Sequence, residues 1–216
     1  MEKISQEEFQ KLLTSGKVLE QDSFGIKVVE TNDDRIIKTF RLKRLFSSAF
    51  FYPYALRFKH NSEKLLKKGF KTISVERISY CREEKRYVVI YPKLAGETLR
   101  DTFEAEPKNI QKRLTDLALL MAKLHKEGVL FRSLHLGNVL LLPDQSLGLI
   151  DVSDMKVFSS PLSLQQRIRN FNHLLRYPQD YKVIDQFGMN RFLTAYCEAA
   201  ELNSDLQKKL FLEFKI

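Results

Sequence analysis

The sequence predicts an α+β protein of two lobes, with a five-stranded antiparallel N-terminal lobe and a mainly helical C-terminal lobe. Three observations lead to this prediction. Short apolar runs separated by turn-forming residues fill 1–91, helical periodicity dominates 98–216, and a segment containing Pro and Gly at 92–97 separates the two patterns. A chain of 216 residues suits one domain of two packed lobes. We therefore expect 1–216 to form a single domain, with 92–97 as the hinge beside an inter-lobe cleft.

The N-terminal lobe begins with a predicted amphipathic helix over 2–14, whose apolar positions include Ile4, Phe9 and Leu13. Closely spaced strands with tight connections follow, and they indicate an antiparallel meander. A second helix ends at Gly69, because glycine commonly terminates helices. The predicted strands occupy 17–21, 26–30, 35–40, 74–80 and 86–91, and the second helix spans 55–68 between the third strand and the fourth.

The C-terminal lobe is dominated by an amphipathic helix over 110–126. Its apolar residues fall on one stripe at helical spacing: Ile110, Leu114, Leu117, Met121 and Leu124. Short apolar runs at 129–142 and 147–152 flank turns. Further helices are predicted at 165–175, 181–187 and 191–200, followed by a final short helix.

The amino-acid composition limits which classes of protein the chain can belong to. Hydrophobic residues make up 44% and charged residues 29%, as in soluble globular proteins. The formal net charge of +9 favours anionic partners such as nucleotides, phosphorylated glycolipids or acidic membrane surfaces, although a basic protein without such a partner fits equally well. An RNA-binding aromatic motif is missing from the sequence, which argues against nucleic acid.

The N-terminus is too polar for a secretory signal, and no apolar run reaches the ~18 residues of a membrane span. Cys81 and Cys197 match no metal-binding spacing and are expected to be reduced thiols. The sequence therefore predicts a cytoplasmic protein, with peripheral attachment to a membrane left open.

The most informative stretch is 125–138, which ends Phe-Arg-Ser-Leu-His-Leu-Gly-Asn, followed by Asp-Val-Ser at 151–153. It resembles the catalytic and metal-binding segments of protein-kinase-like phosphotransferases, H-R-D-L-x-x-x-N and D-F-G. The resemblance implies a protein-kinase-like fold that binds ATP and Mg²⁺. On this interpretation Asn138 and Asp151 lie at the near ends of two adjacent strands, where their oxygens converge on Mg²⁺.

Lys38 falls on the third strand, at the position of the lysine that contacts nucleotide phosphates in this superfamily. Its acidic partner is expected from the helix over 55–68, whose only acidic residue is Glu63. Glu63 and Asn61 lie on opposite edges of the buried face of that helix. Either residue can face Lys38, and if Asn61 does so the ion pair is absent.

Two further segments match nucleotide-binding positions less closely. The turn at 22–25 holds one glycine, Gly25, where protein kinases have three, but Ser23 and backbone amides there could still contact phosphate. The segment 91–99 resembles the inter-lobe hinge of antibiotic and sugar kinases. In those enzymes backbone groups bind adenine, which places Tyr91 and Leu94 in the predicted nucleotide site.

Ser133 stands where active relatives carry the aspartate that accepts or orients the substrate hydroxyl proton. A serine has no useful basicity near neutral pH, and a positioned base contributes roughly 10²–10⁴-fold to the rate. His135 or Asp154 could replace the base through water, and Arg132 could hold a phosphate or brace the loop. Loop packing and solvation are equally good accounts of these side chains.

Within the superfamily, 18–157 looks closest to the lipopolysaccharide-core kinases of Kdo and heptose type, especially the short proteins labelled toluene tolerance. The segments 131–138 and 57–65 carry this resemblance. It implies a Gram-negative cytoplasmic kinase acting on an inner-leaflet phosphoglycolipid in lipopolysaccharide biosynthesis. Two alternatives stay open: a pseudokinase, which binds nucleotide or acts as a scaffold without turnover, and a transferase that moves the nucleotide itself to its acceptor.

Overall fold

The computed structural model describes residues 1–42, 52–105 and 110–215. The chain divides into two compact units, Met1–Leu94 and Ala95–Ile216, and the division lies inside the segment predicted as a hinge. Among the described residues, no helix is both long enough and apolar enough to cross a membrane.

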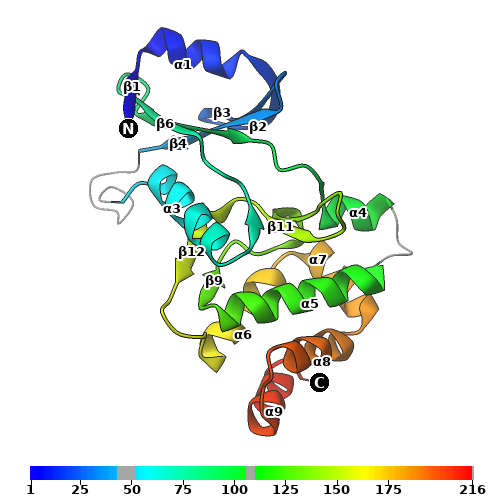
Figure 1. Ribbon diagram of the computed structural model, residues 1–216. Coiled ribbons are helices and arrows are strands. Elements are labelled where there is room, and N and C mark those ends of the chain that lie inside the picture. The colour runs from blue at the N-terminus through cyan, green and yellow to red at the C-terminus, as the bar shows by residue number, and fades with distance from the viewer. Residues whose placement is uncertain (43–51, 106–109, 216) are drawn as a thin grey trace. The chain divides into compact units, whose positions relative to one another are not determined.

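A six-stranded sheet forms the body of the N-terminal unit (Figure 1). All neighbouring strands are antiparallel except β1 and β6, which are parallel. In spatial order the strands are β1 (Glu2–Ile4), β6 (Arg77–Cys81), β7 (Arg86–Pro92), β4 (Arg35–Arg41), β3 (Gly25–Thr31) and β2 (Gly16–Asp22).

One helix covers each face of this sheet. Helix α1 (Gln6–Leu13) buries Phe9 and Leu13 in a cluster with Ile37 of β4. Helix α3 (Tyr54–Lys67) buries Phe58, whose ring lies 5.5 Å from Phe40 of β4. Neighbouring side chains of a strand alternate between faces, so odd positions of β4 meet α1 and even positions meet α3. The short strand β5 (Lys71–Thr72) follows α3.

The start of the chain differs from its prediction. Residues 2–4 form strand β1 and not the first turn of a helix. The Ser5 hydroxyl accepts a hydrogen bond from the Glu8 N–H at 3.1 Å, so Ser5 caps the helix and the residues before it lie outside. The five predicted antiparallel strands are present, and β1 adds a sixth, parallel one.

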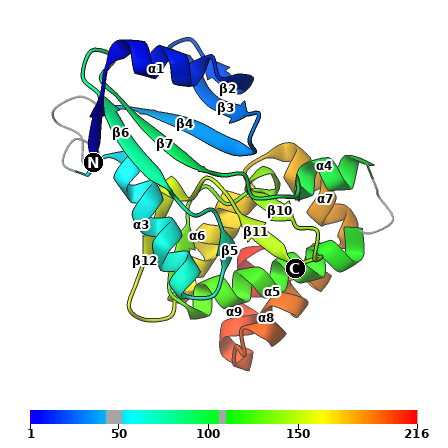
Figure 2. The same cartoon turned by 45° about the horizontal axis from the view of Figure 1, so that its top comes forward.

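The C-terminal unit is mainly helical. Helix α5 (Ile110–Lys126) has the predicted bounds, buries Leu114, Leu117 and Met121, and packs along α8 (Met189–Ala199) (Figure 2). Helix α4 (Leu99–Ala105) was not predicted. The other helices are α6 (Leu164–Leu174), α7 (Pro178–Phe187) and α9 (Ser204–Glu213).

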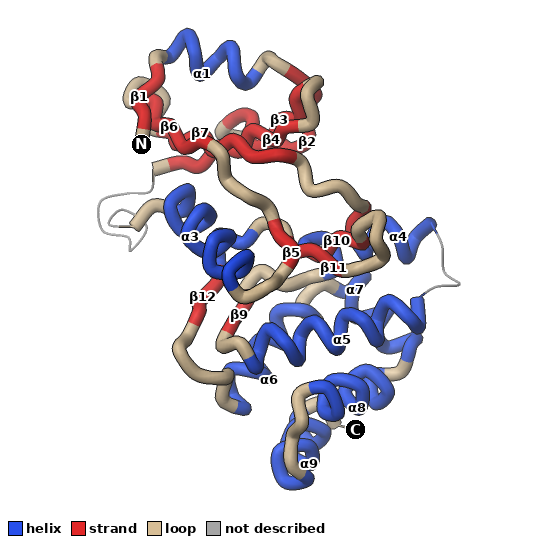
Figure 3. Tube along the Cα trace, viewed as in Figure 1, coloured by secondary structure: helices blue, strands red, loops and turns tan. Residues whose placement is uncertain are grey.

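Short antiparallel strands carry the loops of this unit, as Figure 3 shows in red. Strand β10 (Val139–Leu141) pairs with both β8 (Glu97–Thr98) and β11 (Leu147–Leu149). Strand β9 (Val129–Phe131) pairs with β12 (Met155–Val157). The 3₁₀ turns η2 (Leu136–Asn138) and η3 (Val152–Asp154) directly precede β10 and β12, so the motif residues lie at strand ends.

Candidate functional site

The register of β10 and β11 brings the two predicted metal ligands to one end of a hairpin. Val139 pairs with Leu149, and one residue beyond this pair the Ile150 N–H donates to the Asn138 carbonyl at 3.1 Å. Asn138 therefore directly precedes β10, and Asp151 stands two residues past the end of β11. This is the strand-end placement that the spacing predicts, and their role as metal ligands stays a prediction.

The side chain of Asn138 is held in one orientation. Its Nδ2 donates to the Ser133 carbonyl at 2.8 Å, and the residue is only 7% exposed. With the amide nitrogen engaged, Oδ1 is the atom left for a ligand, and it receives no hydrogen bond from any described residue. A fixed amide oxygen is a suitable donor for a hard cation.

Ser133 and Asp151 lie against each other across the loop. The Ser133 hydroxyl donates to the Asp151 carbonyl at 3.3 Å, and the Ser153 hydroxyl donates to Oδ1 of Asp151 at 3.4 Å. Asp151 has φ 52° and ψ 49°, a left-handed conformation that costs roughly 1–3 kcal/mol in a non-glycine residue. The fold holds Asp151 in this conformation at the position where the motif places a metal ligand.

The two residues considered as substitutes for the missing base are both engaged. A guanidinium nitrogen of Arg132 forms an ion pair with Oδ1 of Asp154, and the Arg132 N–H donates to the Asp154 carbonyl at 3.0 Å. His135 caps η2 by accepting the Gly137 N–H at Nδ1, at 3.1 Å. Arg132 therefore braces the loop through Asp154, and Asp154 is partnered by a cation.

Burial and the positive charge of Arg100 lower the pKa of His135 below its ordinary value. The ring is therefore neutral at neutral pH. Its Nδ1 accepts a hydrogen bond, so the proton of the neutral ring is on Nε2. Neither nitrogen is then available to take a proton from a substrate hydroxyl in this arrangement.

An ion pair with a fully buried carboxylate holds the turn that contains His135 in place. Arg100 of α4 donates to both carboxylate oxygens of Asp180 in α7, at 2.9 and 3.0 Å. The Asp180 side chain has no exposed surface and also accepts the Leu136 N–H at 2.9 Å. Two helices that are distant in sequence thus fix the position of η2.

A second buried network anchors the start of the loop. Asn170 of α6 pairs with the Phe131 backbone in both directions, accepting its N–H at 3.1 Å and donating to its carbonyl at 2.8 Å. His125 lies 3.2 Å from Oδ1 of Asn170 and 2.7 Å from the hydroxyl of Tyr196, which accepts from Arg167 at 2.7 Å.

The donor and the acceptor of each hydrogen bond in this network can be assigned one after another, starting from Arg167. Arginine only donates, so the hydroxyl of Tyr196 accepts from Arg167 and donates to His125, whose other nitrogen donates to Asn170. Burial lowers the pKa of His125 to about 3 and raises that of Tyr196 to about 12, so both are neutral. Sequence reasoning missed these positioning residues, because only the fold brings them to the end of β9.

In the N-terminal unit, Lys38 of β4 lies on the α3 face of the sheet. Its ammonium is 5.5 Å from the ring centre of Phe58. Asn61, one turn further along α3, is buried, whereas the Glu63 side chain is 47% exposed and 3.8 Å from Lys59. These positions favour Asn61 over Glu63 as the α3 residue on the Lys38 side.

A tight hairpin stands where protein kinases carry a glycine-rich loop. Two residues, Ser23 and Phe24, connect β2 to β3, and Ser23 is exposed. Gly25 has φ +114°, a conformation that L side chains rarely adopt. Buried Arg86 of β7 donates to the carbonyls of Phe24 and Ile26, so the hairpin is tied to the sheet.

The two residues predicted for the adenine site lie near the end of the N-terminal unit. Tyr91 is buried in β7, with its ring 5.4 Å from Phe58. Leu94 follows β7 and is partly exposed. Their contact with a nucleotide stays a prediction.

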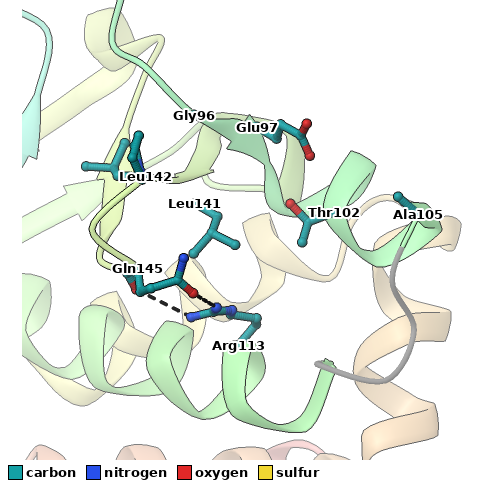
Figure 4. A pocket seen from close by; sticks show the side chains of 9 residues that line it. Gly96, Glu97, Thr102, Ala105, Arg113, Leu141, Leu142 and Gln145 are labelled. Atoms are coloured by element: carbon teal, nitrogen blue, oxygen red, sulfur yellow. Dashed lines mark hydrogen bonds between the residues drawn. The ribbon is translucent and has the colours of Figure 1, made fainter.

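A cavity of about 470 Å³ opens elsewhere in the C-terminal unit (Figure 4). Figure 4 shows Arg113 of α5 and Gln145 directed toward each other at its base. Leu142 and Gln145 belong to the closed end of the β10–β11 hairpin, opposite the end that carries Asn138 and Asp151. The cavity is therefore separate from the candidate metal ligands Asn138 and Asp151.

No protein-family model matches the chain. No curated protein matches it either.

Solved structures do match. The bifunctional kinase-methyltransferase WbdD superposes with a TM-score of 0.51 and 20% identity, over 88% of this chain and 47% of WbdD. A structure of monomeric WbdD gives a TM-score of 0.53 and 19% identity, over 86% and 44%. A divergent kinase from Toxoplasma that lacks the glycine-rich loop gives 0.54 and 14%, over 99% and 86%.

These likenesses show the fold. The chain has the α+β, two-lobed kinase-like fold, as the sequence predicts. The chain spans about half the length of WbdD. The Toxoplasma relative demonstrates that this fold also occurs without a glycine-rich loop.

Proposed function

We propose that this protein is an ATP-dependent phosphotransferase-like protein acting on a sugar of lipopolysaccharide core or a similar phosphoglycolipid. The observation that carries the proposal is the placement of Asn138 and Asp151 at one end of the β10–β11 hairpin, with Ser133 bonded to both. Two of the structural relatives are described as kinases, which supports the same class of chemistry.

The donor set suits Mg²⁺. Asn138 offers a fixed amide oxygen and Asp151 a carboxylate, and Mg²⁺ in kinases is held by one or two such groups together with the substrate phosphates. Bound Mg²⁺ would neutralise charge on the phosphates. Asn138 and Asp151 would orient it, and the Ser133–Asn138 hydrogen bond would keep the amide oxygen turned toward the site.

The N-terminal unit supplies the residues proposed for the nucleotide. Lys38 would contact phosphate, while Ser23 and the backbone around Gly25 would cover it. Tyr91 and Leu94 would bind adenine through the backbone. With Asn61 in place of an acidic partner, Lys38 would be held less firmly than in a kinase that has the ion pair.

A pseudokinase is the second candidate, and a specific observation favours it. Ser133 is not a base, His135 presents a protonated nitrogen, and Asp154 is paired with Arg132. No side chain at the expected position is thus ready to accept the hydroxyl proton. Phosphoryl transfer is mostly positioning and charge stabilisation, so the loss of the base lowers the rate without removing the reaction.

The acceptor is proposed from the family resemblance and from charge. A net charge of +9 favours an anionic glycolipid, and a phosphoglycolipid of the inner leaflet would place the protein in the cytoplasm at the membrane surface.

Mass spectrometry of a co-incubated acceptor tests the proposal. Lipopolysaccharide-core glycolipid incubated with the protein, Mg²⁺ and ATP is expected to gain one phosphoryl group. Asp151→Ala should abolish the gain, and Asp185→Ala, which removes an exposed carboxylate from α7, should not. Gain of a whole nucleotide would replace the kinase with a nucleotidyl transferase, and ATP binding without any gain would leave the pseudokinase.

A further inference from the structure

A group of basic side chains lies around His173 of α6, near the loop after β9 that carries Ser133. We call it the α6 basic cluster, and its members are Arg132, Arg169, His173 and Arg176. Arg169 and His173 are four residues apart and lie on one face of α6, and Arg176 lies in the turn that directly follows the helix. Arg132 joins them from the loop after β9.

Direct contacts fix this position. Helix α6 lies against β9 (Figure 1), and Asn170 is bonded to the backbone of Phe131, the residue before Arg132. His173 is one helical turn beyond Asn170. The side chain of His173 therefore lies near Arg132, at the start of the candidate catalytic loop.

The positive charge of the cluster is not balanced by the described residues. Among the described residues, the one ion pair made by the three arginines joins Arg132 to Asp154. Arg169 is exposed and forms no ion pair or hydrogen bond with any residue that the structure describes. Burial and then the charges of Arg176 and Arg169 lower the pKa of His173, while Asp154 acts in the opposite direction.

Two nitrogens inside the cluster are left without partners. Nε of Arg132 and Nε2 of His173 are buried and make no hydrogen bond with the described part of the chain. Because both nitrogens are buried, an anion would meet the exposed guanidinium groups of Arg169 and Arg176, and it is their positive charge that indicates an anion-binding surface.

The cluster also reaches the candidate chemistry. Arg176 stacks on Tyr177, with its guanidinium 5.0 Å from the ring centre, and the Tyr177 ring lies 4.9 Å from that of His135. The charge of Arg176 acts on both His173 and His135. Arg176 is therefore the member of the cluster that links it, through Tyr177, to the loop that carries His135 and Ser133.

We propose that the α6 basic cluster binds a phosphomonoester group of the acceptor and so holds the acceptor's sugar beside Ser133. The identification of the ligand as the acceptor rests on the proposed function, whereas the existence of an anion site does not. Guanidinium groups suit the site because they make paired, charge-assisted hydrogen bonds to phosphate oxygens. The acceptor class is thus narrowed to sugars that already carry a phosphate.

Calorimetric titration of the full chain with glucose 6-phosphate and with glucose tests the site. The phosphate-bearing sugar should bind and glucose should not. The double variant Arg169→Ala/Arg176→Ala should weaken binding by about 100-fold or more, since it removes two guanidinium groups and each charge-assisted hydrogen bond is worth about tenfold or more. The matched control Arg191→Ala/Lys208→Ala removes two exposed cations from α8 and α9 and should bind as the wild type does.

A second arm separates the sources of the phosphate. Vesicles of phosphatidylcholine with lipid A should bind the wild type more tightly than vesicles of phosphatidylcholine alone, if the phosphate is on a lipid. Binding of glucose 6-phosphate without any preference for lipid A identifies a soluble sugar phosphate. Both results support the site. Equal binding by the double variant and the control, or no binding of either probe, would overturn it.

Titration with ATP and Mg²⁺ keeps this inference distinct from the proposed function. The double variant should bind ATP as the wild type does. Loss of ATP binding in that variant would mean that the cluster serves the nucleotide, which contradicts the inference. If the wild type binds the sugar phosphate but not ATP, the proposed function is contradicted and the anion site is supported.

Discussion

Two polar regions of the C-terminal unit lie near the end of β9, one around His125 and one around His173, and they differ in how fully their hydrogen bonds are made. Around His125 the hydrogen bonds run without a gap from Arg167 through Tyr196 to Asn170 and the Phe131 backbone. Around His173, two buried nitrogens have no partner among the described residues, and arginine charge is unbalanced. A fully satisfied network makes the backbone that it holds rigid, whereas unmade hydrogen bonds leave the region around His173 less constrained.

Replacement of Asn170 tests the closed region with the largest expected effect. Asn170→Ala removes two hydrogen bonds to Phe131 and leaves the His125 ring unpaired on one side. Loss of a buried network of this kind should lower the free energy of unfolding by about 2–4 kcal/mol in urea titrations. Asn190→Ala, on the exposed surface of α8, should change it by less than about 0.5 kcal/mol. An equal effect of the two variants would show that the network contributes nothing.

The pH dependence of stability tests the same network through His125. Its pKa is about 3 in the folded protein and near 6.5 when exposed, so the unfolded chain takes up a proton first as the pH falls. Stability contributed by neutral His125 is therefore complete above pH 6.5 and is lost progressively toward pH 3. In that window wild type should lose up to about 1.4 kcal/mol per pH unit more than His125→Gln. Parallel curves would contradict a buried neutral His125.

The sequence analysis succeeded where a local pattern determined the structure. The stripe of leucines predicted the bounds of α5, and strand-end spacing placed Asn138 and Asp151 correctly. It failed where partners distant in sequence decide the structure. Strand β1 exists because it pairs with β6, and helix α4 has only seven residues to show periodicity.

The candidate site shows the same division. Motif order predicted that Ser133 and Asp151 belong to one site, and their roles stay predictions, but no sequence pattern links Asn170 to Phe131 or Arg100 to Asp180. The spacing of Arg169, His173 and Arg176 was a readable signal that a basic face exists. Its position beside Arg132 required the fold.

Another closed network lies in the N-terminal unit, and Arg86 tests whether it behaves like the His125 network. Arg86→Met keeps the length of the side chain but removes hydrogen bonds to Phe24, Ile26 and Thr39. The free energy of unfolding should fall by about 1–3 kcal/mol, because the buried acceptors lose a charged donor. Hydrogen exchange of the Gly25 amide should quicken as the hairpin loosens. Unchanged exchange would show that the strands alone hold the turn.

The smallest effect is expected at Ser133. Its hydroxyl makes one long hydrogen bond of 3.3 Å to the Asp151 carbonyl, at a partly exposed position. Ser133→Ala should change thermal stability by less than about 1 kcal/mol and ATP affinity only slightly. A loss of stability as large as that of Asn170→Ala would show that the Ser133 hydroxyl is part of a closed network. That result would contradict the view that this loop is free to take part in chemistry.

The central claim is that Asn138 and Asp151 form a metal site that serves a nucleotide, and calorimetric titration with ATP tests it most directly. Titrations with and without Mg²⁺, on wild type, Asp151→Ala and the control Asp185→Ala, decide the matter. Micromolar binding that requires Mg²⁺, disappears in Asp151→Ala and persists in Asp185→Ala is the predicted result. No binding at millimolar ATP, or equal binding by all three proteins without Mg²⁺, would contradict the claim and leave a kinase-shaped interaction module.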